Sequence, residues 1–159
     1  MNRNERQHVL ELKIPPAVLL ALTGALMWLG SAATTATALV IPGRSLGAAI
    51  LMLTGVIIAG LGVASFRRAK TTVNPMKPGS ASVLVDGGIY RRTRNPMYLG
   101  FFVVLLGWAV FLSNLVAFLL LPTFIFYMNR FQIEPEEKAL VALFGQTFTA
   151  YKTRVRRWL

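Results

Sequence analysis

The sequence contains no cysteine and only one histidine, His8, among its 159 residues. The lack of cysteine excludes a disulfide, a thiolate metal site and a thiol nucleophile. A single histidine excludes a metal site built from several histidines of one chain. We therefore expect that the chemistry of this protein involves no metal.

Charged residues are scarce as well. They make up 14% of the chain, against about a quarter in ordinary soluble domains. Hydrophobic residues make up 55% and the mean hydropathy is +0.56, which predicts a membrane protein. The net charge of +11 comes from 17 basic and six acidic residues. Because the basic residues flank apolar stretches and form no groove interleaved with aromatics, they indicate a membrane surface and not a nucleic acid as partner.

Uncharged stretches locate the expected membrane spans. About 20 apolar residues cross the hydrocarbon layer, and in lipid a helix pairs its backbone polar groups internally. The uncharged run 96–129 is too long for one span, and the polar pair Ser113-Asn114 predicts a tight hairpin within it. The expected fold is a single all-α integral membrane domain: four transmembrane helices at 15–42, 46–66, 96–112 and 115–129, a cytoplasmic loop at 67–95 and an amphipathic C-terminal helical segment at 130–159.

The distribution of lysine and arginine sets the expected orientation. Basic residues gather in the N-terminal tail, the long loop and the C-terminal segment, whereas the opposite side carries only Arg44. Both termini and the loop are therefore predicted to face the cytoplasm. An alternative is a signal peptide cleaved near Ala36-Thr37-Ala38. The apolar stretch is longer than the roughly 7 to 15 residues typical of such a region, and its removal would leave the other spans oriented as before.

Small residues are concentrated in the first two spans. Ser31–Ala36 runs for more than a helical turn, and Gly55 with Ala59, then Gly60 and Gly62, lie at helical spacing. Such patterns let helix backbones approach each other closely. They predict tight packing, either within the bundle or in a homodimer.

The C-terminal segment carries apolar residues at intervals of three or four, which predicts a helix, or two short helices broken at Gly145, with one apolar face. Pro135 fits the first helical position, so Glu136 and Glu137 fall in the first turn, where the helix dipole favours carboxylates. Capping alone could explain both. Alternatively, one faces inward and meets a cationic ligand. The repeating residues are Leu140, Phe144, Phe148, Tyr151, Val155 and Trp158.

A second polar cluster precedes the third span. It contains Tyr90 and the run Arg94–Gly100, and before it come the short apolar piece Ser82–Val85 and the turn Asp86-Gly87-Gly88. The apolar piece predicts a contact with the bundle or with a bound ligand. One interpretation is that the tyrosines are merely interface anchors and the arginines merely contact lipid headgroups. The alternative is a functional site shared with Glu136 and Glu137.

The ordered set of these motifs resembles the isoprenylcysteine carboxyl methyltransferase family, which is similar to the phospholipid N-methyltransferases. The resemblance covers about residues 66 to 159. It implies a helical integral membrane enzyme that binds S-adenosylmethionine from the cytoplasmic side, methylates a lipophilic acceptor and releases S-adenosylhomocysteine. We expect the protein in a bacterial or archaeal cell membrane. The matching pieces are Gly88-Ile89-Tyr90, Arg94-Asn95-Pro96-Met97-Tyr98-Leu99-Gly100, Glu136-Glu137 followed by Leu140, Phe144 and Gly145, and Tyr151 with Val155.

The resemblance also implies which residues form the site. Substrate-binding positions are Arg130 and Gln132. The prenylcysteine enzymes have arginine in place of Gln132 and histidine in place of Asn95, and both departures weaken the case for a carboxylate as methyl acceptor. Asn95 can still donate and accept hydrogen bonds. The implied cofactor-binding residues are Ser82, Val83, Leu84, Val85, Tyr90, Asn95, Pro96, Met97, Tyr98 and Glu136.

Methyl transfer from a sulfonium is an in-line displacement, so the protein mainly has to align donor and acceptor and exclude water. Glu136 suits the cofactor's amino group. The catalytic candidates are Arg94, for the cofactor's carboxylate or an anionic substrate group, and Glu137, as proton acceptor for an amine or thiol. Two other functions stay open: a related membrane reductase with a nicotinamide cofactor, and a small membrane protein that only scaffolds a partner.

Overall fold

The computed structural model describes residues 12–69 and 82–159. Within these residues the secondary structure is helical, and one isolated bridge joins Ala38 to Asn114. The predicted all-α class is therefore confirmed. The helices are α2 (Pro16–Ala33), η1 (Thr35–Thr37), α3 (Arg44–Arg68), η3 (Gly88–Arg91), α4 (Pro96–Leu112), α5 (Leu115–Tyr127), the π-helical turn η4 (Met128–Ile133) and α6 (Glu134–Arg154).

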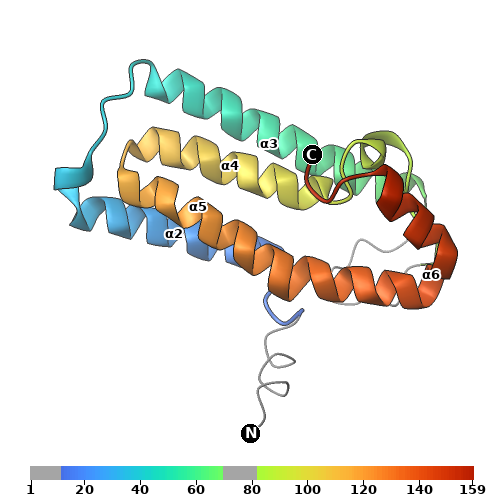
Figure 1. Cartoon of the computed structure of the whole chain (residues 1–159). Helices are drawn as coiled ribbons and strands as arrows, with labels where there is room; N and C mark the ends of the chain where they lie inside the picture. Colours follow the sequence, from blue (N-terminus) through green and yellow to red (C-terminus); the bar gives the residue numbers. More distant parts are fainter. Residues whose placement is uncertain (1–11, 70–81) are drawn as a thin grey trace, which may run out of the picture.

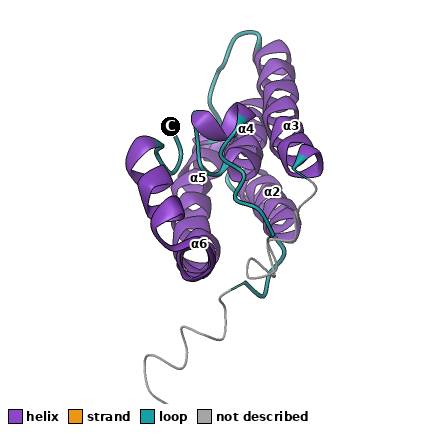
Figure 2. Ribbon diagram, turned by 90° about the vertical axis from the view of Figure 1, so that its right-hand side faces the viewer, coloured by secondary structure: helices purple, strands orange, loops and turns teal. Residues whose placement is uncertain are grey.

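Helix α4 lies at the centre of the bundle. It packs against α3 on one side, while α2 packs against both α4 and α5 (Figure 1). The end-on view shows α4 between α3 and α5 (Figure 2). Apolar side chains of α2, α4 and α5 form the main core, which includes Met27, Leu105, Ala109, Ala117 and Phe124.

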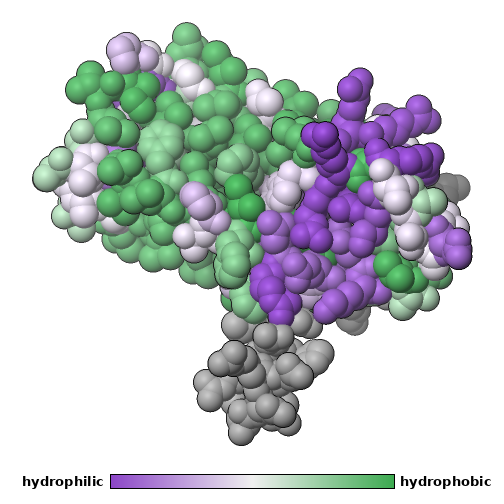
Figure 3. All heavy atoms as spheres, in the orientation of Figure 1, coloured by the Kyte–Doolittle hydropathy of each residue, from purple (hydrophilic) through white to green (hydrophobic). Residues whose placement is uncertain are grey.

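Polar residues gather at one end of the molecule, which we call the polar end: residues 82–95, α6 and residues 155–159. The remaining visible surface is largely hydrophobic (Figure 3). Among the described residues, three helices are long and apolar enough to cross a membrane, namely α2, α3 and the continuous helix from Leu115 to Arg154. The apolar part of that third helix is α5, since α6 is hydrophilic. Helix α4, with 17 residues, is apolar but shorter.

The first helix is shorter than the expected span at 15–42, because α2 ends at Ala33. Two threonines follow it and their hydroxyls bond back to the chain: Thr34 Oγ1 donates to Gly30 O at 2.6 Å and Thr37 Oγ1 to Thr34 O at 2.8 Å. Asn114 Nδ2 also donates to Thr34 O at 2.9 Å. These side chains compete with the backbone ladder and end the helix. At about 1.5 Å per residue, its 18 residues still reach about 27 Å.

The hairpin between α4 and α5 turns at Ser113-Asn114, as the sequence predicts. Ser113 has a left-handed backbone (φ 49°), and the Asn114 side chain caps α5 by accepting from Val116 N at 2.9 Å. Asn114 is 2% exposed and also accepts from the Thr37 hydroxyl at 3.0 Å. The same residue thus starts one helix and fastens the end of another.

No break in the helix marks the expected boundary between the fourth span and the C-terminal segment at 129/130. The chain passes through the wide turn η4 directly into α6. In a regular α-helix the ring of Pro135 would clash with the carbonyl four residues earlier, and a π-helical turn relieves that crowding. Pro135 lies at the start of α6, with Glu136 and Glu137 in the first turn, as predicted, but Ile133 makes no side-chain cap and η4 runs directly into this turn. Since α6 has no free N-terminus here, capping alone does not explain the two glutamates.

The break predicted as an alternative at Gly145 is present. Gly145 has φ 51° and ψ −124°, so α6 bends there into two pieces. Glycine adopts this backbone conformation most easily, because it has no β-carbon. Beyond the bend, Phe148, Tyr151 and Val155 form a small core with Leu84 packed against it. The apolar piece around Leu84 therefore contacts the bundle.

Glycines bring α3 and α4 into close contact. A β-carbon added to Gly55 would lie 2.6 Å from Gly100 O, and one added to Gly62 would lie 2.8 Å from Met97 Cγ. Both positions thus serve packing within the bundle. The predicted packing within the bundle does not extend to Gly60, where an added β-carbon would meet nothing within 4 Å among the described residues. The homodimer stays a prediction.

Candidate functional site

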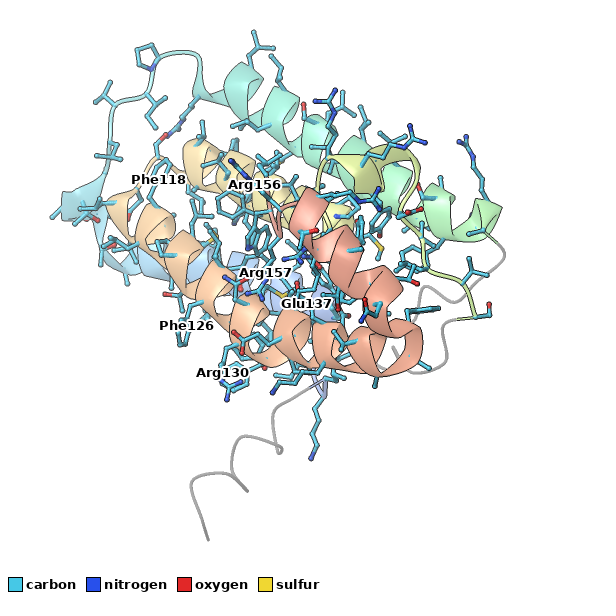
Figure 4. All side chains as sticks on the ribbon, turned by 45° about the vertical axis from the view of Figure 1, so that its right-hand side comes forward. Phe118, Phe126, Arg130, Glu137, Arg156 and Arg157 are labelled. Atoms are coloured by element: carbon cyan, nitrogen blue, oxygen red, sulfur yellow. The ribbon has the colours of Figure 1, made fainter. Side chains whose placement is uncertain are left out.

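The start of α4, the start of α6 and the last residues of the chain meet at the polar end. Figure 4 shows Glu137 on α6 beside Arg157 near the C-terminus, with Arg130 lying away from both. The site contains two carboxylates that face different partners.

Glu136 lies in a buried polar cluster with Tyr98 of α4 and Gln132 of η4. The Tyr98 hydroxyl donates to Glu136 Oε1 at 2.5 Å, and Gln132 Nε2 donates to the same oxygen at 3.3 Å. Tyr98 is 4% exposed and Gln132 is 2% exposed. The spacing of four residues between Gln132 and Glu136 places both on one face of the helix. The three residues come from motifs that the sequence had already singled out.

The environment of Glu136 disfavours its charged form. Burial raises the pKa of Glu136 from 4.5 to about 7, with a further rise from the neighbouring Glu137, while the bonds from Tyr98 and Gln132 hold the pKa down. A cation bound next to this carboxylate would reverse the effect and stabilise the ionised form. Glu136 is thus suited to a positively charged group.

Glu137 has the opposite surroundings. It accepts from Arg157 Nη2 at 2.9 Å, and it pairs with Arg94 Nη2 at 3.1 Å and Lys152 Nζ at 3.4 Å. Burial alone would raise the pKa of Glu137, but the bond from Arg157 and the charges of Arg94, Arg157 and Lys152 outweigh it, so the pKa is lowered. Glu137 is therefore ionised at neutral pH and is a weak proton acceptor.

Arg94 is almost fully buried, with 11% of its side chain exposed. Only its Nη2 bonds to Glu137. Within the described part of the chain, Nε and Nη1 are buried and have no hydrogen-bond partner. A buried donor without an acceptor costs free energy, so these two groups call for an anionic partner. A carboxylate would match the planar guanidinium.

Asn95 and Thr93 contact the end of the chain. Asn95 Nδ2 donates to the Arg157 carbonyl oxygen at 2.9 Å, and the Thr93 hydroxyl donates to the same oxygen at 3.3 Å. The backbone N of Arg94 donates to the Arg156 carbonyl oxygen at 3.0 Å. Asn95 thus holds the C-terminal residues by its side chain.

Sequence reasoning missed Thr93, Lys152, Arg157 and Trp158 as parts of this region. Arg157 is 20 residues from Glu137 and 63 from Arg94, and it is one of many basic residues in the C-terminal segment. The motif spacing gives no signal for it. Only the bend at Gly145 and the return of the chain bring it to the site.

The other predicted cofactor residues lie around this centre. Tyr90 is buried, and its carbonyl oxygen accepts from the Tyr151 hydroxyl at 2.7 Å. Pro96 is buried in the first turn of α4, whereas Met97 packs towards α3. In the segment 82–85, Ser82 and Val83 are exposed, and Leu84 and Val85 are half-buried. Tyr90 and Pro96 support the site from its sides.

The two predicted substrate residues separate in the structure. Gln132 belongs to the buried cluster with Tyr98 and Glu136. Arg130 instead pairs with Glu134 at 3.2 Å and lies over the Phe131 ring. Among the described residues, no group of three or more metal-binding side chains occurs.

The apolar helices with a polar site at one end define a class, a membrane-embedded helical protein. Comparisons with known proteins narrow this class. A sequence model described as phospholipid methyltransferase matches residues 44–147. The chain belongs to the phospholipid methyltransferase family.

Three relatives illustrate the similarity. An uncharacterized protein of Haemophilus influenzae is 44% identical over 63 residues, which are 40% of this chain and 100% of that protein. A protein-S-isoprenylcysteine O-methyltransferase of Schizosaccharomyces pombe is 37% identical over 73 residues, 46% of this chain and 31% of that enzyme. The Saccharomyces cerevisiae enzyme of the same name is 38% identical over 82 residues, 50% of this chain and 33% of that enzyme.

The chain thus spans about a third of the length of the two yeast methyltransferases. No solved structure matches significantly. The predicted resemblance to the methyltransferase family is confirmed. Together with the apolar helices, it identifies an integral membrane protein.

Proposed function

We propose that this protein is an S-adenosylmethionine-dependent methyltransferase that acts on a lipophilic acceptor in the membrane. Its relatives named as O-methyltransferases support the reaction class. The observation that carries the proposal is a pair of unmet charges: among the described residues, Arg94 has two buried donors without an acceptor, and the half-buried carboxylate of Glu136 contacts neutral donors and no cation.

An amino acid group fits this pair of residues. Arg94 would donate to its carboxylate from one of the two groups without a partner, Nε or Nη1, and Glu136 would accept from its ammonium group. When bound, S-adenosylmethionine supplies a methyl group made electrophilic by the sulfonium. The chain itself would orient the ligand through Arg94 and Glu136 and shield it from water with the residues packed around Tyr90 and Tyr98.

The proton acceptor is a weaker part of the sequence-based prediction. Glu137 is held by three cationic side chains, Arg94, Lys152 and Arg157, and its lowered pKa makes it a poor base. We propose instead that Glu137 orients Arg94. The amide of Gln132 is engaged by Glu136 and Tyr98, and this leaves the carboxylate acceptor of the prenylcysteine enzymes with less support.

The membrane arrangement belongs to the same proposal. Four spans, formed by α2, α3, α4 and α5, would place residues 82–95, α6 and both termini on the cytoplasmic side. The asymmetry of the basic residues supports this arrangement, because the opposite end of the bundle carries a single basic residue, Arg44 at the start of α3. A lipophilic acceptor would reach the polar end from the bilayer.

Labelled cofactor tests the proposal directly. The purified protein in lipid nanodiscs is incubated with methyl-labelled S-adenosylmethionine and a total membrane lipid extract, and the labelled product is identified by mass spectrometry. We expect one lipid class to be labelled, with loss of labelling in Glu136→Gln and retention in the matched control Glu134→Gln. Absence of label, together with no binding of S-adenosylhomocysteine in calorimetry, would refute the proposed function.

A further inference from the structure

The last residues of the chain form an arm that crosses the site. The arm leaves α6 at Val155, whose backbone is extended (φ −124°, ψ 131°). Its carbonyl oxygens at Arg156 and Arg157 accept from the segment before α4, at distances of 2.9 to 3.3 Å. At the far side, Trp158 Nε1 donates to Asn129 Oδ1 at 3.0 Å. The arm is therefore fixed on both sides of Arg157.

The side chain of Arg157 binds Glu137 with both ends of its fork. Nε donates to Oε1 at 3.3 Å, and Nη2 donates to Oε2 at 2.9 Å. This two-point contact matches the planar geometry of a guanidinium and a carboxylate, which a lysine cannot reproduce. Arg157 thus occupies one lone pair on each oxygen of Glu137.

The occupation of Glu137 affects Arg94. Because Arg157 takes the two-point contact, Arg94 reaches Glu137 only through Nη2, at 3.1 Å. Its Nε and Nη1 stay without a partner within the described part of the chain. If Arg157 were removed, the two oxygens of Glu137 would offer Arg94 the same two-point contact. Arg94 would then turn its fork to Glu137 and away from any ligand.

We infer that Arg157 is a positioning residue: by occupying Glu137 it keeps part of the Arg94 guanidinium available for the carboxylate of a bound ligand. This inference rests on the proposed function, since it assumes a ligand with an amino acid group. Lys152 also contacts Glu137, but as a point charge at 3.4 Å it contacts only one oxygen.

Calorimetric titration with S-adenosylhomocysteine measures the effect. We expect Arg157→Gln to weaken binding about tenfold, the size of one lost charge-assisted hydrogen bond. Arg157→Lys is expected to fall between this variant and the unmodified protein. The matched control is Arg156→Gln, which removes the same charge from an exposed neighbouring side chain of the arm and should bind as the unmodified protein does.

A second ligand separates positioning from general damage. 5′-Methylthioadenosine has no carboxylate, so all four proteins should bind it with the same affinity. Unchanged binding of S-adenosylhomocysteine by Arg157→Gln would overturn the inference, and so would an equal loss for both ligands. If Arg157→Gln fails to fold, Arg157→Lys decides, because full affinity in that variant contradicts a need for the fork. Lack of binding by the unmodified protein would overturn the proposed function, and the inference with it.

Discussion

Glu136 and Glu137 are neighbours in the chain, yet they carry opposite shifts of the pKa. The difference follows from what each side chain faces: Glu136 meets the neutral donors Tyr98 and Gln132, and Glu137 meets arginine and lysine. Adjacent residues of a helix point about 100° apart. Two residues of the same type can therefore meet different partners within one helical turn.

The pKa of Glu136 predicts a pH dependence of cofactor binding. Since its pKa in the free protein is about 7 and an ammonium group prefers the ionised carboxylate, affinity for S-adenosylhomocysteine should rise with pH. If only the ionised form binds, the dissociation constant at pH 6 should be about tenfold above its value well above pH 7. Calorimetry between pH 5.5 and 7 measures this rise, below the range in which the ligand's own amino group titrates.

Two variants test the assignment of this pH dependence. Glu136→Gln should abolish the rise and leave weak binding across the range. Tyr98→Phe removes a donor that lowers the pKa of Glu136, so the rise should move to higher pH. A rise that persists in Glu136→Gln would mean that another group titrates.

The same shift has a consequence for stability. The folded-state pKa of Glu136 lies above its usual value of 4.5, so ionisation is disfavoured in the folded protein. The contribution of Glu136 to stability is therefore highest below pH 4.5 and falls as the pH rises towards 7. A bound cation would offset this loss.

At the scale of helices, the contact between α3 and α4 depends on missing side chains. In lipid the hydrophobic effect does not drive helices together, so close backbone packing at small residues matters more than in water. A β-carbon added to Gly55, Gly62, Gly100 or Gly107 would lie only 2.5 to 2.9 Å from an atom of the opposing helix. The sequence pattern predicted such packing for Gly55 and Gly62, but it could not identify α4 as the partner.

A single methyl group at this contact should separate the helices. In Gly100→Ala the new β-carbon would lie 2.5 Å from Gly55 O and 2.7 Å from Ala59 N, and neither backbone atom can move alone. We expect a destabilisation of about 1 to 3 kcal/mol from overpacking, seen as a lower unfolding midpoint in detergent. Gly60→Ala is the matched control.

Gly60 has open space where a β-carbon would be added. A β-carbon at Gly60 meets nothing within 4 Å, and alanine favours a helix over glycine by about 1 kcal/mol. Its unfolding midpoint should stay the same or rise. Equal losses in both variants would show that the α3–α4 contact is not the cause.

At the scale of the whole molecule, polarity is divided along the bundle. The polar end holds the site, and the other end holds the connections at residues 34–43 and 113–114 (Figures 1 and 3). An apolar body of this kind can enter the bilayer only with the charged end in water. In the proposed arrangement the site would lie at the membrane surface, within reach of a water-soluble cofactor and of a lipid.

Cysteine labelling tests the proposed orientation. The chain has no cysteine, so each introduced one is unique. Val40→Cys sits at the end opposite the site, where Val40 is 96% exposed, and Lys138→Cys sits exposed at the polar end. A membrane-impermeant maleimide should label only Val40→Cys in intact cells and only Lys138→Cys in inverted vesicles. Labelling of Lys138→Cys in intact cells would contradict the proposed orientation and indicate the reverse one.

Several features could be derived from the sequence because they depend on local properties of the chain. Uncharged length predicted the positions of α3, α4 and α5, and the pair Ser113-Asn114 predicted the turn between the latter two. The ordered motifs predicted the family. Because polar residues are scarce in this apolar chain, few other positions could hold a turn or a helix end.

Other features depend on contacts between distant residues, and only the tertiary structure decided them. The end of α2 depends on Asn114, 80 residues away, and the wide turn η4 replaces the expected break before Pro135. Most of all, the roles of Glu136 and Glu137 depend on which side chains face them. The sequence predicted a site shared by Arg94 and the two carboxylates, whereas the fold, by bringing Arg157 back to Glu137, decided that Glu137 is neutralised by cations and that Glu136 faces the neutral donors Tyr98 and Gln132.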